Sequence, residues 1–210
     1  MTTSISYAIT THNETISFEK LVNRINQYID TDDELIILDD YSTNTHTLKT
    51  LNLCKNVHSS KFTGNYAEHK NNLNRLCTKE YIFQLDADEL PTELLLHNIK
   101  EIINANKVDL LLVPRENIVH GIQQHHLTKW NWVCDEKQRI NYPDYQGRIY
   151  KNSNEIKWVR PLHEYIEGHV TFGRLPGNVG LDILHIKDIE GQVANNDRYD
   201  RNYNADGTQR

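Results

Sequence analysis

The sequence predicts an α/β protein with a mostly parallel central sheet and flanking helices. Two observations lead to this prediction. Short apolar runs, typical of strands buried on both faces, alternate along the chain with segments whose apolar residues recur at helical spacing. Three of these runs end abruptly in polar clusters, at residues 10–14, 39–43 and 86–89. Strands that alternate with helices form parallel sheets, so we expect the three clusters to meet at one edge.

The elements of the first half follow from these patterns in order. A strand over residues 4–10 precedes a helix over residues 17–28, whose apolar face contains Phe18, Leu21 and Ile25. The next predicted elements are a buried strand, a weak helix, a short strand, a helix and a strand, over residues 35–38, 47–53, 57–59, 66–77 and 81–85.

The second half has a different character. A helix follows Pro91, and residues 110–113 form a further buried strand. Residues 115–145 are rich in His, Trp, Asn and Gln and lose the periodic pattern, which predicts a long functional loop region. Residues 195–210 are polar and are expected to be frayed, disordered or conditionally ordered. Additional strands are predicted over residues 147–151, 156–159 and 181–186.

Composition argues against several classes of protein. The net charge of −6 is opposite to that of a typical nucleic-acid-binding protein, although a bound cation would still allow a phosphate ligand. The three cysteines, Cys54, Cys77 and Cys134, are far apart, which predicts reduced thiols rather than disulfides or a zinc site. No apolar run approaches the roughly 18 residues that cross a bilayer, and residues 1–10 lack a signal-peptide pattern. We therefore expect a cytoplasmic protein without a transmembrane segment.

The most informative motif is an acidic cluster at the end of an apolar strand. Asp86, Asp88 and Glu89 place three carboxylates within four residues, and a cation would relieve their mutual repulsion. Alternation along a strand would put Asp86 and Asp88 on one side, with Ala87 opposite. Mg²⁺ and Mn²⁺ commonly bind one or two carboxylates together with substrate phosphates. The motif predicts a metal–diphosphate site; the alternative is a solvated acidic turn before a helix with Pro91 in its first turn.

Other chemical motifs are absent or have the wrong spacing. Neither GxGxxG nor GxxxxGK[ST] occurs, which argues against an ordinary dinucleotide fold and against a P-loop. His163-Glu164 resembles the start of a HExxH zinc motif, but the second His would fall at Glu167.

The remaining motifs resemble, in order and spacing, those of the family-2-like glycosyltransferases of small bacterial and phage type. The chain resembles this family over residues 5–187, most specifically in its first half. Tyr41 departs from the Asp-Asp-Gly-Ser form of the second element, and the helix before the acidic strand lacks the usual glycines. The matching segments are YAITTHNE at residues 7–14, ILDDYST at 37–43, Lys70-Asn71, the Asp-x-Asp strand at 81–89, Trp158 with His163-Glu164, and Ile183-Leu184-His185.

The resemblance implies the GT-A fold, a Rossmann-like α/β sandwich, and a metal-dependent hexosyltransferase. The enzyme would move a sugar from a nucleotide diphosphate donor, with UDP-sugars favoured, to a hydroxyl of a glycan or other acceptor, with inversion. Residues 1–90 would form the nucleotide-binding half, residues 91–190 the acceptor and catalytic half, and residues 191–210 a polar tail. The oligomeric state does not follow from the sequence.

The resemblance also assigns residues to the donor nucleotide. Asp39 accepts a hydrogen bond from the base, and Asp40 either shares this role or bonds loop amides in an Asx turn. Thr11 and Asn13 reach the base or ribose, or instead cap the following helix, and Thr10 belongs to the same binding set.

A second assigned pair lies on the helix before the acidic strand. Lys70 is placed to offset the charge of the diphosphate, and Asn71 accompanies it in the donor-binding set. The alternative for Lys70 is an ordinary solvent-exposed helix lysine.

The metal would be Mn²⁺ or Mg²⁺. Asp88 is the expected direct ligand, and Asp86 bonds the ribose or reaches the metal, directly or through water. His185 is the third ligand, completing a set suited to Mn²⁺, unless it is a satisfied core histidine. His163 is the competing candidate.

Glu164 is the expected general base, because inverting transfer needs a carboxylate that takes the proton of the acceptor hydroxyl. The alternative for Glu164 is a salt bridge to Arg160 or Arg148, and Asp135 and Asp144 are weaker candidates for the base.

Trp130 and Trp132 either form an aromatic wall for an acceptor sugar or pack in the core.

Two other functions of the protein remain open. A sugar-phosphate nucleotidyltransferase would need a Gly-rich basic loop after the first strand, which residues 10–14 do not supply. A non-catalytic nucleotide- or glycan-binding module is the third possibility.

Overall fold

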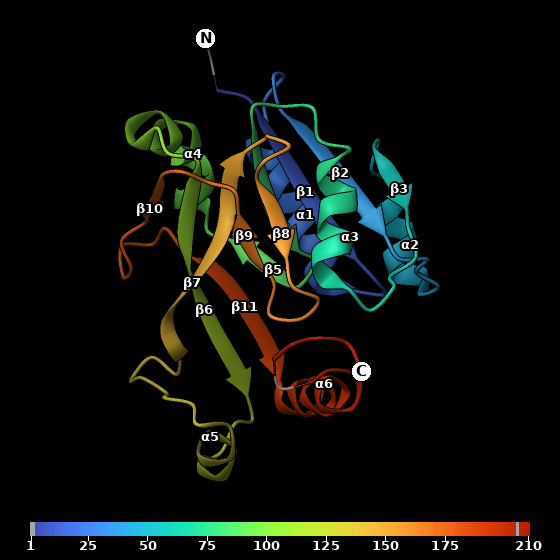
Figure 1. Ribbon diagram of the computed structural model, residues 1–210, viewed down its shortest axis with the longest axis vertical. Helices are drawn as coiled ribbons and strands as arrows, with labels where there is room; N and C mark the ends of the chain where they lie inside the picture. Colours follow the sequence, from blue (N-terminus) through green and yellow to red (C-terminus); the bar gives the residue numbers. More distant parts are fainter. Residues whose placement is uncertain (1–2, 205) are drawn as a thin grey trace.

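The computed structural model describes residues 3–204 and 206–210. The described chain forms a large sheet with helices on both faces (Figure 1). A separate antiparallel pair consists of β8 (Lys157–Val159) and β9 (Tyr165–Glu167). The strands of the large sheet are β1 (Ile5–Thr11), β2 (Glu34–Asp39), β3 (Val57–Ser59), β4 (Tyr81–Asp86), β5 (Glu89–Pro91), β6 (Leu110–His120), β7 (Ile140–Lys151), β10 (Phe172–Arg174) and β11 (Ile183–Asp188).

The strand order of the large sheet is β3-β2-β1-β4-β7-β6-β11-β5, and β10 pairs with β6 outside this path. Neighbouring strands from β3 to β4 are parallel, as are β6 with β11 and β6 with β10. β7 runs antiparallel to β4 and β6, and β5 runs antiparallel to β11. The prediction of a mostly parallel α/β sheet with flanking helices is therefore confirmed.

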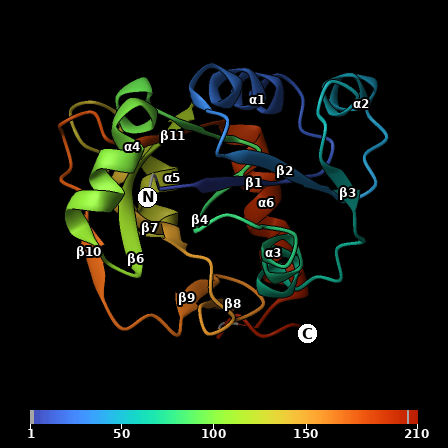
Figure 2. The ribbon, with the colours of Figure 1, turned by 90° about the horizontal axis from the view of Figure 1, so that it is seen from above.

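The helices lie on both sides of this sheet. Figure 2 shows α1, α2 and α4 on one side, with α3 and the β8–β9 pair on the other. α5 and α6 lie at the far end of β6 and β11. No helix in the described ranges combines the length and apolar character that crossing a bilayer requires. The bounds are Ile16–Tyr28 (α1), Thr45–Leu51 (α2), Tyr66–Asn74 (α3), Glu93–Asn106 (α4), Gln124–Trp130 (α5) and Ile189–Asn202 (α6).

Two apolar clusters hold the layers together. Alternate residues of β1 face different clusters: Ile5, Tyr7 and Ile9 belong to the larger cluster, with residues of α1 and α4, whereas Ala8 belongs to the smaller one. The smaller cluster includes residues of α3 and of the β8–β9 pair. Because the sheet is covered on both faces, its strands are continuously apolar, which explains why the first half was predicted with boundaries close to those observed.

A helix follows Pro91, as predicted, but the alternative that placed Pro91 in its first turn is wrong. Pro91 ends the short strand β5 instead of occupying the first turn of a helix. α4 begins at Glu93, and the hydroxyl oxygen of Thr92 accepts the backbone N–H of Leu95 at 3.3 Å as its N-cap.

The prediction of a long loop over residues 115–145 is also wrong. β6 continues to His120, α5 follows, and β7 begins at Ile140 and pairs with β6 along most of its length. Much of this paired segment is exposed or half-buried, so its sequence lacks the apolar alternation of a core strand.

Part of the C-terminal region that was expected to be frayed, disordered or conditionally ordered is a regular helix. Residues 195–202 belong to α6, and Tyr203 at its end is buried and donates a hydrogen bond to the carbonyl of Gly64 at 2.6 Å. α6 itself has no buried residue among those described, so the sequence contains no apolar stripe that would predict a helix.

Candidate active site

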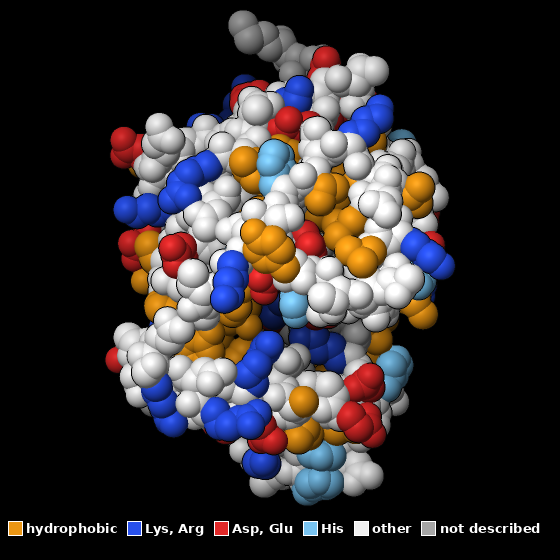
Figure 3. All heavy atoms as spheres, turned by 90° about the vertical axis from the view of Figure 1, so that its right-hand side faces the viewer, with side chains coloured by type: hydrophobic (Ala, Val, Ile, Leu, Met, Phe, Trp, Pro, Cys, Tyr) orange, Lys and Arg blue, Asp and Glu red, His pale blue; other side chains and the backbone are white. Residues whose placement is uncertain are grey.

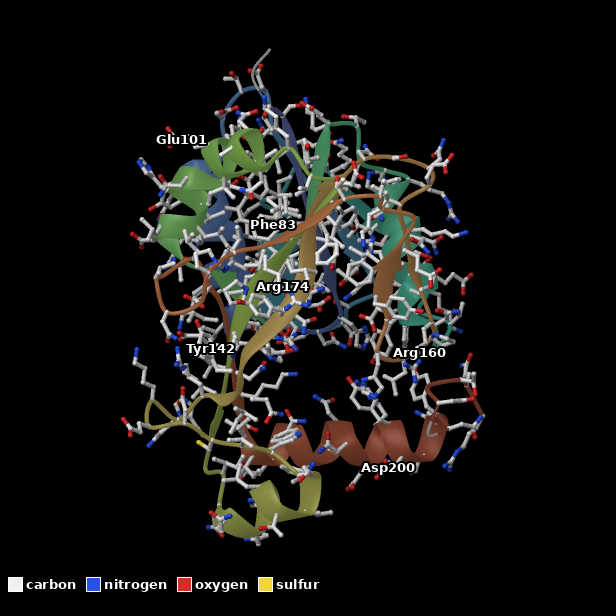
Figure 4. All side chains as sticks on the ribbon, turned by 60° about the vertical axis from the view of Figure 1, so that its left-hand side comes forward. Phe83, Glu101, Tyr142, Arg160, Arg174 and Asp200 are labelled. Carbon is white, nitrogen blue, oxygen red and sulfur yellow. The ribbon has the colours of Figure 1, made fainter. Side chains whose placement is uncertain are left out.

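A cavity of about 1190 Å³ lies between the sheet, α3 and α6. Figure 3 shows a hollow on this face, with Lys and Arg side chains at its edge and floor. In Figure 4, α6 runs opposite the lower end of the sheet and forms one boundary of this space. The volume is above the ~300–1,000 Å³ typical of a pocket for one small ligand.

The carboxyl ends of β1, β2 and β4 meet at this cavity, as predicted. β1 pairs in parallel with both other strands, so that Thr11 lies beside Asp39 and Thr10 lies beside Asp86. The hydroxyl of Thr10 donates to the Asp86 carboxylate at 3.3 Å. This edge of an open parallel sheet is where α/β folds bind their ligands.

Lys70 joins two of the predicted residues. Its side chain is 3% exposed, and its ammonium nitrogen lies 3.1 Å from Asp86 and 2.7 Å from Glu164. It also lies 4.6 Å from the ring centroid of Trp158. The alternative of an exposed helix lysine is therefore wrong. Glu164 pairs with Lys70, so the alternative of a salt bridge from Glu164 to Arg160 or Arg148 is wrong too.

A buried network of arginines and carboxylates holds the side chain of Asp86 in place. Arg148 donates to Gln84 at 2.9 Å, to Asp86 at 2.8 Å and to Glu89 at 2.6 Å. Glu89 also accepts from Arg115 at 2.9 Å and from the backbone N–H of Asp86 at 3.1 Å. Burial would raise the pKa of Asp86, but the charges of Lys70 and Arg148 hold it well below its usual range. Asp86 is therefore a charged carboxylate with two cationic partners.

Asp88 and His185 lie side by side. The Nε2 atom of His185 is 3.2 Å from the Asp88 carboxylate, and Lys187 is 3.1 Å from the same oxygen. Burial would raise the pKa of Asp88, but the hydrogen bond and charge of His185 and the charge of Lys187 lower it below its usual range. The competing histidine, His163, lines the cavity near Tyr199, with the ring centroids 6.5 Å apart.

The Nδ1 atom of His185, on the side of the ring away from Asp88, contacts Asn117. Asn117 donates its amide N–H to Asp144 at 2.8 Å, so its amide oxygen faces Nδ1 of His185 at 2.7 Å. Nδ1 must then carry a proton. The 3.2 Å contact between Nε2 and Asp88 is a hydrogen bond when Nε2 is also protonated, and a divalent cation bound between the two groups would replace that proton and use the Nε2 lone pair.

The position of Asp88 differs from the one predicted. β4 ends at Asp86, and Ala87 and Asp88 form a turn before β5. The two aspartates therefore do not lie on one side of a continuous strand. Asp86 is bound by Lys70 and Arg148, whereas Asp88 faces His185, and no group of three metal-ligating side chains occurs in residues 3–204 and 206–210.

The two aspartates at the end of β2, Asp39 and Asp40, have separate roles. Both carboxylate oxygens of Asp39 accept hydrogen bonds from Ser42, at 3.0 Å from its backbone and 2.5 Å from its hydroxyl. Asp39 thus makes the local turn that was considered for its neighbour. Asp40 lines the cavity and accepts the backbone N–H of Phe62 at 2.9 Å.

The three other residues assigned to the donor, Asn13, Asn71 and Thr11, differ in their contacts. The side-chain oxygen of Asn13 accepts the backbone N–H groups of Thr43 and Asn44, both at 2.8 Å, so it fixes the loop after β2 and does not cap α1. Asn71 exchanges two hydrogen bonds with the backbone of Trp158, at 2.8 and 2.9 Å, and so holds β8. Thr11 lines the cavity, and its buried hydroxyl has no hydrogen-bond partner among the described atoms.

The two weaker candidates for the base are already engaged. Asp144 accepts from Arg115 at 2.7 Å and from Gln146 at 2.7 Å, and Asp135 pairs with Arg139 at 2.7 Å. Glu164 is itself paired with Lys70 at 2.7 Å, so all three carboxylates are in ion pairs, but Asp135 does not line the cavity, whereas Asp144 and Glu164 do.

Sequence reasoning missed the residues that support the site. These residues are dispersed over β4 to β11, and a partial signal was present: Gln84 and Arg148 are polar or charged residues inside otherwise apolar strands. A buried charge of this kind requires a partner, although the sequence does not say which one. Glu89 was assigned to the acidic cluster and Arg148 to a possible pairing with Glu164, whereas they bond each other. The missed residues are Gln84, Arg115, Asn117 and Lys187.

The fold is that of known GT-A glycosyltransferases. The structure of S. aureus TarS 1–349 in complex with UDP-GlcNAc aligns with a TM-score of 0.58 at 17% identity, covering 89% of this chain and 59% of that chain. The same TarS segment with UDP aligns with a TM-score of 0.58 at 18% identity, covering 87% and 60%. This chain thus spans about 60% of the length of those chains. These likenesses define the class of fold.

The sequence identifies the family within this class. The family model described as Glycosyl transferase family 2 matches residues 6–170, and the chain belongs to this family. A comparison with curated proteins found no match. Membership of this family favours glycosyl transfer over the nucleotidyltransferase considered from the sequence.

Proposed function

We propose that this protein transfers a sugar from a UDP-sugar to an acceptor hydroxyl with inversion, using Mn²⁺ or Mg²⁺. The observation that carries the proposal is the placement of the Asp88–His185 pair and the Glu164 carboxylate around one cavity at the carboxyl ends of β1 and β4. The cavity therefore holds one group suited to a metal–diphosphate and one group suited to an acceptor proton.

The donor set fits a divalent cation. Asp88 offers a carboxylate and His185 an imidazole lone pair, and Asn117 holds the imidazole in the required tautomer. Two protein ligands with substrate phosphates are a common set for these ions. A bound cation would neutralise the charge that develops on the leaving diphosphate. Lys187 lies 3.1 Å from Asp88, close enough for its positive charge to stabilise the diphosphate as well.

Glu164 is proposed to be the general base. The acceptor oxygen forms its bond to the anomeric carbon, the bond from that carbon to the diphosphate breaks, and Glu164 takes the acceptor proton. Lys70 pairs with Glu164 at 2.7 Å and with Asp86 at 3.1 Å, so one buried cation fixes the base relative to the end of β4.

The groups near Asp40 favour uracil over cytosine. The Asp40 carboxylate would accept the N3–H of uracil, whereas the corresponding nitrogen of cytosine is itself an acceptor. Thr11 offers an unpartnered hydroxyl, and His69, whose pKa is lowered by burial, has an unpartnered Nδ1 among the described atoms. Phe62 adds an aromatic ring at the cavity wall. We therefore place the base against Asp40 rather than Asp39.

Replacing Asp40 by Asn is expected to weaken UDP binding by roughly tenfold or more, because a hydrogen bond to a charged group contributes about 1.5–3 kcal/mol. Isothermal titration with UDP in Mn²⁺ measures the change. The control is the neighbouring variant Asp39→Asn. We expect it to lower the melting temperature of the protein and to reduce UDP affinity less than Asp40→Asn does. A larger loss of affinity in Asp39→Asn would return the base-binding role to Asp39.

The variant Glu164→Gln is expected to bind the donor normally and to lose sugar transfer by at least about a hundredfold, the scale of general-base catalysis. The amide keeps the size of the side chain but cannot accept the proton. Product formation and UDP affinity should be measured on the same preparation. Glu167→Gln, a nearby exposed position on β9, is the matched control. Full transfer by Glu164→Gln would remove Glu164 from the mechanism.

A further inference from the structure

Beyond the cavity, the chain builds a projecting segment, residues 116–142, which we call the arm. It consists of the distal part of β6, the helix α5, a connecting loop and the start of β7. Figure 1 shows α5 at the extreme end of the molecule, away from the helices that cover the sheet. α5 contains no buried residue among those described, so it is not part of the core.

The arm carries a continuous series of aromatic rings. The ring centroids of His125 and His126 are 3.8 Å apart, and those of His126 and Trp130 are 5.3 Å apart with nearly parallel planes. Trp130 is followed by Trp132 at 4.8 Å. Both tryptophans are half-buried, which rules out the alternative that they pack in the core.

The backbone holds these rings in fixed positions. Asn131, in a left-handed conformation, ends α5, and the backbone N–H of Trp132 donates to the carbonyl of Leu127 at 2.9 Å. Val133 exchanges two hydrogen bonds with Asn141 at the start of β7, at 2.8 and 2.9 Å. Rings that are ordered before binding lose little conformational entropy when a ligand stacks on them.

The series leads into the cavity. Trp132 and Asn141 belong to its wall, together with Glu164 and Asp88. A molecule lying along the rings would therefore have one end inside the cavity that holds the proposed base. This continuity makes the arm an extension of the acceptor side of the site.

The charges of the arm distinguish among possible partners. Its six charged residues other than histidine are three cations and three acids, so the arm has no net charge with neutral histidines. Arg139 pairs with Asp135 at 2.7 Å and with Glu116 at 3.2 Å, which leaves few charges for a partner. An anionic membrane or a nucleic acid would select a basic surface. Aromatic faces bordered by neutral hydrogen-bonding groups suit the apolar faces and hydroxyls of sugars.

The arm also has neutral hydrogen-bonding groups beside its aromatic rings. The backbone N–H of Gln123 donates to Nδ1 of His126 at 3.1 Å, so the Nε2–H of the neutral ring remains a donor. Gln124 is exposed beside it. We propose that the arm binds a neutral oligosaccharide acceptor of several sugar units, with its reacting end in the cavity. This inference rests on the proposed function.

The test is binding of the wild-type protein, with Mn²⁺ and UDP, to an array of neutral oligosaccharides of two to eight units. The best glycan is then titrated against Trp130→Ala, Trp130→Phe and Val133→Ala. We expect Trp130→Ala to weaken binding roughly tenfold, on the scale of one lost aromatic contact, and Trp130→Phe to retain most of it. Val133, an exposed apolar residue of the same arm, is the control that should change little.

The outcomes separate this inference from the proposed function. Equal glycan binding by wild type and Trp130→Ala would overturn the role of the arm. Absence of glycan binding, in a protein that UDP still stabilises, would also overturn it and leave the donor site intact. Trp130-dependent glycan binding without any UDP effect would support the arm and contradict the proposed function. Trp130-dependent binding to anionic vesicles, or self-association, in place of glycan binding would assign the surface to another partner.

Discussion

The variant Asp88→Ala is expected to lose metal-dependent release of UDP from a UDP-sugar by at least about a thousandfold, because metal charge stabilisation supplies several kcal/mol of the barrier reduction. Asp88 faces His185 at 3.2 Å at the cavity wall, so its removal takes away one of the two proposed protein ligands of the metal. The side chain is outside the apolar core, and the variant should unfold in a cooperative transition like the wild type. UDP release should be measured over a range of Mn²⁺ concentrations.

Asp200→Ala, an exposed position on α6, controls for the loss of a carboxylate. It is expected to retain wild-type turnover and wild-type dependence on Mn²⁺. An Asp88→Ala enzyme that kept both would show that the metal, if required, binds elsewhere.

The largest effect on stability is expected for Glu89→Gln. The Glu89 side chain is fully buried and accepts hydrogen bonds from Arg148 and Arg115, at 2.6 and 2.9 Å. Neutralising it leaves two guanidinium groups with less compensating charge inside the protein. Breaking a buried ion pair in this way costs about 3–5 kcal/mol, which urea unfolding would measure directly.

The matched control is Glu93→Gln, which neutralises a glutamate that is 63% exposed and lies 3.5 Å from Arg24. An exposed pair of this kind contributes about 0–1 kcal/mol. If both substitutions changed the free energy of unfolding by less than about 1 kcal/mol, the buried network could not be what stabilises the end of β4.

The parts of the fold that the sequence predicted are those with a strong local signal. β1, β2 and β4 are buried on both faces, so their apolar runs are continuous and their polar ends are conspicuous. The parallel arrangement of such strands is enough to bring Thr11 and Asp86 to one edge. The juxtaposition of Asp88 and His185, 97 residues apart, was expected from the order of motifs.

The parts that were not predicted depend on contacts between distant residues. Lys70 bonds Glu164, 94 positions away, and no local pattern distinguishes it from an exposed helix lysine. The arm and α6 have few buried residues, so neither shows apolar periodicity, although both are regular structures. Asp39 and Asp40 are adjacent and chemically identical, and only the fold shows that Ser42 engages the first.

The most direct test of the account is the thermal stability of the protein with UDP, GDP or CDP, each in Mn²⁺ or in EDTA. A ligand at about 100 times its Kd stabilises the folded state by roughly 2.7 kcal/mol, which gives a clear rise in Tm. We expect UDP with Mn²⁺ to raise the Tm more than GDP or CDP does, and EDTA to remove the effect. No rise with any nucleotide at millimolar concentration would contradict the metal–diphosphate site at Asp88 and His185.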